Sequence, residues 1–149
     1  MLPEIGKLAP AFTANNQHGN TVSLADFSGK KLVLYFYPKD DTPGCTAEAC
    51  SLRDNYEALI SQGYAIVGVS PDDEKKHTKF ITKYNLPFDL LADTDNAIAL
   101  AYGVWVEKSM YGRKYMGIAR TTFVINENGI LEEIIEKVDT KNHAQQLLK

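Results

Sequence analysis

The first half of the chain contains three runs of apolar residues that predict two kinds of β-strand. In residues 11–24 (AFTANNQHGNTVSL), apolar and polar residues alternate in part on either side of His18-Gly19-Asn20. This pattern predicts a short N-terminal β-hairpin. Residues 31–38 (KLVLYFYP) and 64–70 (YAIVGVS) are almost continuously apolar and rich in β-forming residues. Such runs are typical of strands that are covered on both faces, so both are expected at the centre of a sheet.

The segments between and after these strands predict helices and a second hairpin. The stretch 45–63 is expected to form one helix that stops at Gly63. Ser70 is expected to cap the next helix, with Pro71 as its first residue and its end near Tyr84. The other predicted elements are a strand at 88–93, a short helix at 95–103, a hairpin formed by 120–125 and 130–137 around the turn 126–129, and a last helix at about 141–149 capped by Thr140.

The order of these elements predicts the fold class. Buried strands that alternate with helices pair in parallel through right-handed crossovers, and the late hairpin adds antiparallel strands. The expected fold is therefore a three-layer α/β domain with a mixed central sheet flanked by helices and an N-terminal β-hairpin. Residues 1–149 suit a single domain. Ligands of such sheets bind beyond the carboxyl ends of the strands, where the loop from Pro38 to Cys45 is expected.

The composition limits the cellular compartment and the classes of binding partner that are expected for this chain. The chain has 16 basic and 19 acidic residues, a net charge of −3, which gives no reason to expect nucleic acid or an anionic membrane as a partner. No apolar run reaches the roughly 20 residues that cross a bilayer, and the first residues do not resemble a signal peptide. We therefore expect a cytoplasmic protein, in a compartment that keeps thiols reduced.

The only two cysteines, Cys45 and Cys50, lie close together in the first predicted helix. Thr42 suits the N-cap position and Pro43 the first helical position, which places Cys45 in the first turn. Unpaired N–H groups and the helix dipole stabilise an anion there, and the thiolate is the reactive form of cysteine. Cys45 also begins an apolar stripe that continues through Ala49, Leu52, Tyr56 and Leu59, whereas Cys50 lies off that stripe.

The spacing of the two thiols has a mechanical consequence. Residues five apart in a helix have Cα atoms about 8.6 Å apart. A disulfide tolerates no more than about 7 Å. Cys45 and Cys50 can therefore pair only if the first turn unwinds, which suits a redox cycle better than a static brace.

Two other interpretations of the cysteines compete with a redox pair. Taken alone, the two thiols are explained as well by packing as small core residues as by a redox pair. The helix start at Cys45 then favours redox chemistry. A metal site is less favoured, because the spacing is C-x4-C and the three histidines, His18, His77 and His143, are scattered; we interpret these as surface or capping residues. The absence of C-x-x-C argues against a general disulfide reductase or isomerase.

Residues 37–54 (YPKDDTPGCTAEACSLRD) resemble the active-site stretch of peroxiredoxins, in particular the bacterioferritin-comigratory or peroxiredoxin Q subfamily. Pro38, Thr42 and Cys45 match the family pattern P-x-x-x-T-x-x-C, and Cys50 stands where members with a resolving cysteine in the same helix carry it. Arg120 in GIARTTFVI matches the distant arginine of the family. The resemblance covers essentially the whole chain and implies a thioredoxin-like fold.

The resemblance implies reduction of hydrogen peroxide and organic hydroperoxides by a thiol, without a metal or an organic cofactor. In that scheme Cys45 is oxidised to a sulfenic acid and Cys50 resolves it as an intramolecular disulfide. Arg120 holds the anion and polarises the O–O bond. Thr42 caps the helix and turns its hydroxyl toward the thiolate or the peroxide, and Pro38 shields the sulfur from water.

The resemblance also implies thioredoxin, or a similar dithiol, as the reductant, and a monomer. An alternative function from another class is a redox-sensing interaction protein that uses the same Cys45–Cys50 switch. Glu48 stays outside the expected catalytic set, because pairing with an arginine and a solvated helix face explain it equally well. Core and loop packing is the favoured explanation for most of the aromatic residues Tyr102, Trp105, Tyr111 and Tyr115, and a substrate or partner surface is the alternative.

Overall fold

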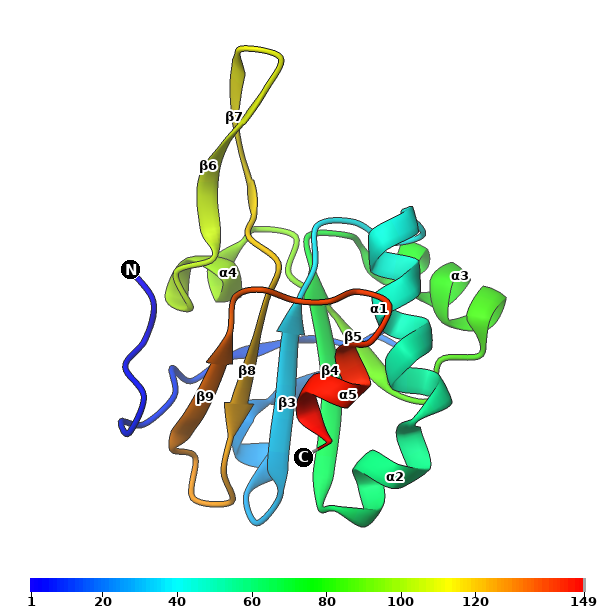
Figure 1. Ribbon diagram of the computed structural model, residues 1–149, viewed down its shortest axis with the longest axis vertical. Coiled ribbons are helices and arrows are strands. Elements are labelled where there is room, and N and C mark those ends of the chain that lie inside the picture. Colours follow the sequence, from blue (N-terminus) through cyan, green and yellow to red (C-terminus); the bar gives the residue numbers. More distant parts are fainter. Residues whose placement is uncertain (149) are drawn as a thin grey trace.

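The computed structural model describes residues 1–148 and is built on one mixed sheet of seven strands (Figure 1). In spatial order the strands are β2 (Thr21–Ser23), β1 (Thr13–Asn15), β5 (Asp89–Ala92), β4 (Tyr64–Ser70), β3 (Lys31–Phe36), β8 (Thr121–Ile125) and β9 (Leu131–Ile135). Strand β3 is parallel to β4 and β4 to β5, whereas β8 and β9 run antiparallel to their neighbours. The hairpin β1–β2 joins the sheet through an antiparallel bridge between β1 and β5.

Helices cover both faces of this sheet. They are η1 (Leu24–Phe27), α1 (Pro43–Asp54), α2 (Tyr56–Ser61), α3 (Glu74–Tyr84), α4 (Ala97–Ala101) and α5 (His143–Leu147). Residues of α1, α3 and α5 share one buried cluster with one face of β3, and residues of α4 share a second cluster with the other face. The mixed sheet, the layer of helices on each face and the N-terminal hairpin confirm the predicted three-layer α/β architecture.

Strand β3 lies at the centre of the structure and separates the two clusters. Leu32, Leu34 and Phe36 belong to the cluster beside α4, while Val33 and Tyr35 belong to the cluster beneath α1. All five side chains are 0% exposed. Because successive side chains of a strand point to opposite faces, a strand covered on both faces reads as one continuous apolar run.

The predicted long helix at 45–63 is in fact two helices. Helix α1 ends at Asp54 and α2 begins at Tyr56, so the prediction of one helix was wrong. The side chain of Asn55 donates a hydrogen bond to the carbonyl oxygen of Ser51 (2.8 Å). Asparagine side chains compete with the backbone for such carbonyls, which accounts for the break at this position.

Two other predicted helix starts are corrected. Helix α3 begins at Glu74, where the Asp73 side chain accepts a hydrogen bond from the N–H of Lys76 (2.9 Å), while Ser70 is the last residue of β4. Helix α5 begins at His143 after Asn142, so Thr140 is not its cap. The predicted end of that helix at Lys149 lies outside the described residues.

A hairpin that the sequence analysis did not predict projects from the body of the molecule (Figure 1). Its strands are β6 (Trp105–Met110) and β7 (Arg113–Ile118), which pair only with each other within residues 1–148. Tyr111 and Gly112 form its turn with φ values of 52° and 77°, as a two-residue hairpin turn requires. No helix among residues 1–148 is both long and apolar enough to span a bilayer.

Gly68 in β4 gives a stability prediction, because the sheet leaves no room for a methyl group there. A Cβ atom at Gly68 would lie 2.7 Å from Leu90 Cδ2 and 2.8 Å from Tyr35 Cζ. We expect Gly68→Ala to lower the free energy of unfolding by about 1–3 kcal/mol, as overpacking of cores does, in urea unfolding experiments. The same substitution in a Tyr35→Phe background should cost less, since the Tyr35 hydroxyl would lie 2.9 Å from the new methyl group. An unchanged free energy of unfolding for Gly68→Ala contradicts this account.

Candidate active site

The loop that follows β3 leads into α1 and carries the predicted motif. Pro38 is half-buried directly after Tyr37, and Thr42 immediately precedes α1 with extended backbone angles. The carbonyl oxygen of Thr42 accepts a hydrogen bond from the N–H of Thr46 (2.8 Å), so Thr42 occupies the predicted N-cap position. Its side chain does not cap the helix: the hydroxyl donates to the carbonyl oxygen of Lys39 (2.9 Å). The cap position was predicted correctly and the side-chain cap was wrong.

Cys45 is buried in the first turn of α1, beside a cation from a distant strand. The side chain is 1% exposed and packs in the cluster that contains Ala49 and Leu52, as the predicted stripe required. Arg120, which directly precedes β8, donates a hydrogen bond from Nη2 to Cys45 Sγ (3.3 Å). A Cβ atom at Gly44 would lie 3.1 Å from the same nitrogen, so glycine leaves room for the guanidinium. The structure thus brings together two predicted residues that are 75 positions apart.

Glu48 completes this cluster. Arg120 Nη1 donates to Glu48 Oε1 (2.7 Å), and the Glu48 side chain is 0% exposed. The solvated-face interpretation of Glu48 is therefore wrong and the arginine pairing is correct. Burial raises the pKa of Glu48 from 4.5 to about 7, against the opposing effect of Arg120. The feature of the sequence that could have placed Glu48 in the site is its position three residues after Cys45, on the same face of the helix.

His143 lies behind Glu48 and is buried rather than on the surface. Its Nε2 is 3.6 Å from Glu48 Oε2 and 2.8 Å from the Thr122 hydroxyl, and its Nδ1 is 2.7 Å from Gln146 Oε1. Burial is the main cause that lowers the pKa of His143. In the neutral ring Nδ1 donates to Gln146 and Nε2 accepts from Thr122, which satisfies both nitrogens. Glu48 Oε2 has no hydrogen-bond partner within residues 1–148.

His77 is also buried, which corrects its interpretation as a surface or capping residue, whereas His18 is exposed as expected. His77 Nδ1 lies 2.7 Å from Asp40 Oδ2 and its Nε2 lies 2.9 Å from the carbonyl oxygen of Leu91. Asp40 also accepts a hydrogen bond from Tyr37. These contacts fix the loop between β3 and α1 against α3 and β5.

Cys50 lies in the same unbroken helix as Cys45 and is half-buried, and both thiols are free. With α1 continuous from Pro43 to Asp54, the two residues keep the helical separation that prevents a disulfide. Among residues 1–148, no group of three or more His, Cys, Asp or Glu side chains could hold a metal ion.

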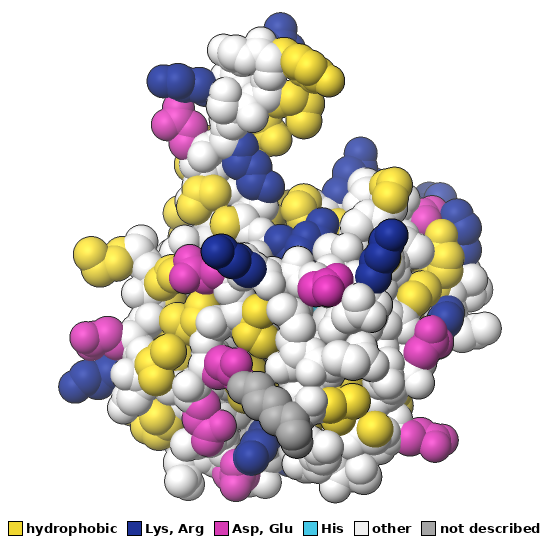
Figure 2. Space-filling model, in the orientation of Figure 1, with side chains coloured by type: hydrophobic (Ala, Val, Ile, Leu, Met, Phe, Trp, Pro, Cys, Tyr) yellow, Lys and Arg dark blue, Asp and Glu magenta, His cyan; other side chains and the backbone are white. Residues whose placement is uncertain are grey.

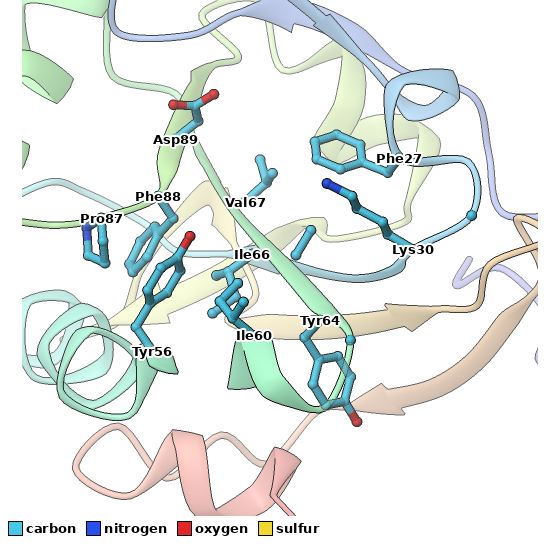
Figure 3. Close-up of a pocket in the computed structure, with 13 residues that line it drawn as sticks. Phe27, Lys30, Tyr56, Ile60, Tyr64, Ile66, Val67, Pro87, Phe88 and Asp89 are labelled. Carbon is cyan, nitrogen blue, oxygen red and sulfur yellow. The ribbon is translucent and has the colours of Figure 1, made fainter. Parts of the chain in front are cut away.

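The cavity shown in Figure 3, of about 430 Å³, does not include these thiols among its lining residues. It is lined by residues of α2, the first half of β4 and the segment before β5, including Tyr56, Tyr64 and Phe88. None of Pro38, Thr42, Cys45, Cys50 or Arg120 lines it. The loop from Pro38 to Cys45 lies instead directly after β3, at the carboxyl end of a parallel strand, as the fold class predicts.

Known proteins match this chain along nearly its whole length. The model of the AhpC/TSA family matches residues 5–134. A putative peroxiredoxin Bcp of Coxiella burnetii is 48% identical over 145 residues, which are 97% of this chain and 96% of that protein. The peroxiredoxin Bcp of Bacillus subtilis is 48% identical over 149 residues, which are 100% of this chain and 95% of that protein.

Solved structures agree with these relatives. The crystal structure of a PrxQ mutant of Xylella fastidiosa is 30% identical with a TM-score of 0.93, covering 99% of this chain and 94% of that chain. The bacterioferritin comigratory protein of Xanthomonas campestris, solved in trapped intermediate and ligand complexes, is 34% identical with a TM-score of 0.89, covering 97% and 95%. These matches confirm the thioredoxin-like fold. The chain therefore belongs to the AhpC/TSA family, among its Bcp and peroxiredoxin Q proteins, and is a thiol-dependent peroxidase.

Proposed function

We propose that Cys45 is the peroxidatic cysteine of this peroxidase and Cys50 its resolving cysteine. The observation that carries the proposal is the hydrogen bond of 3.3 Å from Arg120 Nη2 to the buried Cys45 Sγ, at the start of a helix. A guanidinium and a helix N-terminus both stabilise a thiolate, and the thiolate is the nucleophile.

The first step breaks the O–O bond of the peroxide. The Cys45 thiolate attacks one oxygen, and the electron pair of the O–O bond leaves on the other oxygen, which takes a proton to give water or an alcohol. The sulfur is oxidised by two electrons to a sulfenic acid. Arg120 donates hydrogen bonds toward the oxygens that gain charge, and Thr42 and Pro38 bound the approach to the sulfur. The proposed substrates are hydrogen peroxide and alkyl hydroperoxides, since the Xanthomonas campestris relative is described by its alkyl peroxide reduction activity.

The second step forms a disulfide and requires movement. The Cys50 thiolate attacks the sulfenic sulfur, the S–O bond breaks, and the departing hydroxide takes a proton to leave as water. Because five residues of intact helix keep the Cα atoms about 8.6 Å apart, the first turn of α1 must unwind. The loop before it is held by the buried contacts of Asp40, so the unwinding is expected on the helical side of Thr42.

Recycling needs two electrons from an external dithiol. A thiol reductant follows from the family, and we propose thioredoxin for this role. We also propose that residues 1–149 act as a single-domain monomer in the cytoplasm, where such dithiols are kept reduced.

The test follows turnover in the Cys50→Ser variant. With thioredoxin, its reductase and NADPH, the unchanged protein should consume NADPH continuously when hydrogen peroxide or an alkyl hydroperoxide is added. Cys50→Ser should reduce one equivalent of peroxide and then stop, because its sulfenic acid has no resolving thiol. Ser61→Ala, a change in α2 that touches neither thiol, serves as the matched control and should cycle normally. Continuous thioredoxin-dependent cycling by Cys50→Ser at the unchanged rate would remove Cys50 from its proposed role.

A further inference from the structure

An aspartate just before the N-cap of α1 ties the start of that helix to the end of α3. We propose that Asp41 is a positioning residue of the resolution step, held in place by Lys83 and Tyr84. These three side chains form a clamp that keeps the first turn of α1 wound, and the opening of the clamp sets how fast the disulfide forms. The proposal rests on the roles proposed above for Cys45 and Cys50.

The contacts of Asp41 are short and come from two neighbouring residues. Its Oδ2 accepts a hydrogen bond from Lys83 Nζ (2.8 Å), which is also an ion pair, and its Oδ1 accepts one from the Tyr84 hydroxyl (2.8 Å). The Lys83 ammonium lies over the Tyr84 ring, 5.3 Å from its centroid. Lys83 and Tyr84 are the last two residues of α3, and only Thr42 separates Asp41 from the first residue of α1. The clamp therefore joins the end of one helix to the start of the other.

Tyr84 is attached to both ends of α1. Its hydroxyl binds Asp41 before the helix, and its carbonyl oxygen accepts a hydrogen bond from Arg53 Nη1 in the last turn (2.7 Å). Its ring packs edge-on against Phe80, with 5.5 Å between the centroids, and Phe80 is 2% exposed. Helix α3 thus lies on the same face of the sheet as α1 and is anchored in their shared core (Figure 1). Of the two attachments, the one through Asp41 adjoins the turn that must unwind.

Polar contacts rather than packing hold Asp41 itself. The residue borders a cavity of about 350 Å³ between the loop and α3, and its side chain is 42% exposed. Figure 2 shows basic and acidic side chains at the surface over α1 and α3. The φ angle of Asp41 is 57°, in the left-handed region that aspartate tolerates but that remains unfavourable. Release of the carboxylate allows the backbone to return to more common conformations, which redirects the chain that follows.

The residue before Asp41 is held far more firmly. Asp40 is 9% exposed, its side chain contacts Tyr37 and His77, and its N–H donates to Asp72 Oδ2 (2.7 Å). These buried contacts fix the loop in both states of the helix. Asp41 is therefore the last point of attachment before α1 that can open without disturbing the core.

The movement of Cys45 shows why this attachment matters. Five residues at 100° each place Cys50 about 140° round the helix from Cys45. Because Cys45 is 1% exposed, its sulfur must leave the core and move round the helix axis to reach Cys50. Only three residues separate Asp41 from Cys45, and the φ angle of one of them, Pro43, is restricted. The turn that unwinds lies on the helical side of Thr42, and opening the clamp lets Thr42 itself follow.

The experiment measures the two chemical steps separately in a single turnover without reductant. Reduced protein is mixed with one equivalent of hydrogen peroxide, and peroxide loss and disulfide formation are followed after rapid quenching. We expect Lys83→Met and Asp41→Asn each to speed disulfide formation about threefold, within the range for loss of a partly exposed ion pair. Asparagine also tolerates the left-handed region, so Asp41→Asn removes the charge and keeps the backbone. The peroxide step should be unchanged, because the wound helix start remains the main form of the reduced protein.

Three further measurements separate the clamp from a general loss of structure. Lys79→Met is the matched control, since Lys79 borders the same cavity from α3 and forms no ion pair within residues 1–148; it should leave both steps unchanged. The double variant of Asp41→Asn with Lys83→Met should be no faster than either single variant, because one substitution already opens the clamp. In 1 M salt the unchanged protein should approach the rate of Lys83→Met, since salt screens exposed ion pairs. A rate of disulfide formation in Lys83→Met that coincides with that of Lys79→Met overturns the proposal, as does an equal change in both chemical steps.

Amide hydrogen exchange tests the clamp without peroxide. The N–H of Thr46 donates to the carbonyl oxygen of Thr42 (2.8 Å), so its exchange reports unwinding of the first turn. In the reduced protein Lys83→Met should speed this exchange about threefold, whereas Lys79→Met should not. If the unchanged protein forms no disulfide with peroxide, the proposed role of Cys50 fails, and the exchange rates still decide whether the clamp exists. Equal exchange in the two variants overturns the clamp even where the disulfide forms.

Discussion

Replacing Cys45 with serine is expected to lower peroxide consumption by at least about a thousandfold, as removal of an enzyme nucleophile does. Serine fits the buried space of Cys45, which is 1% exposed, and its hydroxyl can accept the hydrogen bond from Arg120. The hydroxyl does not ionise near neutral pH, however, and oxygen is a far weaker nucleophile toward a peroxide than a thiolate. The measurement is the initial rate of peroxide loss in the thioredoxin-coupled assay, with the melting temperature followed to show that the fold is kept.

The matched control is Cys50→Ser, because it removes the other thiol of the same helix. It should still consume one equivalent of peroxide, whereas Cys45→Ser should consume none. A Cys45→Ser variant that kept the rate of the unchanged protein would show that the peroxide reacts elsewhere. The same assay also tests the alternative that the protein is a redox sensor built on the Cys45–Cys50 switch. A sensor unwinds its helix on oxidation but does not sustain peroxide turnover.

The sequence was sufficient to predict those parts of the fold and site that depend on local chemistry. Buried strands were recognised at β3 and β4 because a strand covered on both faces is apolar at every position. The helix start at Cys45 was recognised because threonine suits the N-cap position and proline the first helical position, which Thr42 and Pro43 occupy. The distant partner Arg120 was identified by family resemblance, since nothing local links it to a helix 75 residues earlier.

The rest depends on contacts that no local pattern contains. The hairpin β6–β7 is largely exposed on both faces, so its strands lack the inward and outward alternation that identifies a strand. Glu48 and His143 are polar residues that a composition argument places on the surface. Each is buried against a partner that lies far away in the sequence: Arg120 is 72 residues from Glu48, and Thr122 is 21 residues from His143.

Replacing Arg120 with alanine is expected to slow peroxide reduction by about 10²–10³, the usual effect of removing one donor that stabilises developing charge. The guanidinium lies 3.3 Å from the sulfur, so its loss should also move the pH midpoint of Cys45 alkylation upward. The comparison uses second-order rates with hydrogen peroxide in the Cys50→Ser background, where recycling does not limit the rate. An unchanged rate and an unchanged alkylation profile would count against the proposed role of Arg120.

The same substitution has a second effect, on stability, which must be separated from the first. Without Arg120, Glu48 is a buried carboxyl group that has lost its ion-pair partner, and its folded-state pKa should rise further above about 7. A raised carboxyl pKa means that the folded state binds the proton more tightly than the unfolded state does, so stability is lost as pH increases. Arg120→Ala should therefore lower the free energy of unfolding by about 3 kcal/mol at pH 8, within the range for a broken buried ion pair, and by less at pH 6.

The double variant Arg120→Ala with Glu48→Gln distinguishes the two effects. Glutamine fills nearly the same space as Glu48 without a charge, so the double variant should recover much of the stability lost at pH 8 and lose its dependence on pH between 6 and 8. It should not recover the peroxide rate, because no cation has returned to the sulfur at the position of Arg120. If Glu48→Gln restored the rate together with the stability, Arg120 would act on catalysis only by neutralising Glu48. If it restores stability alone, the guanidinium acts on the thiolate and the peroxide directly.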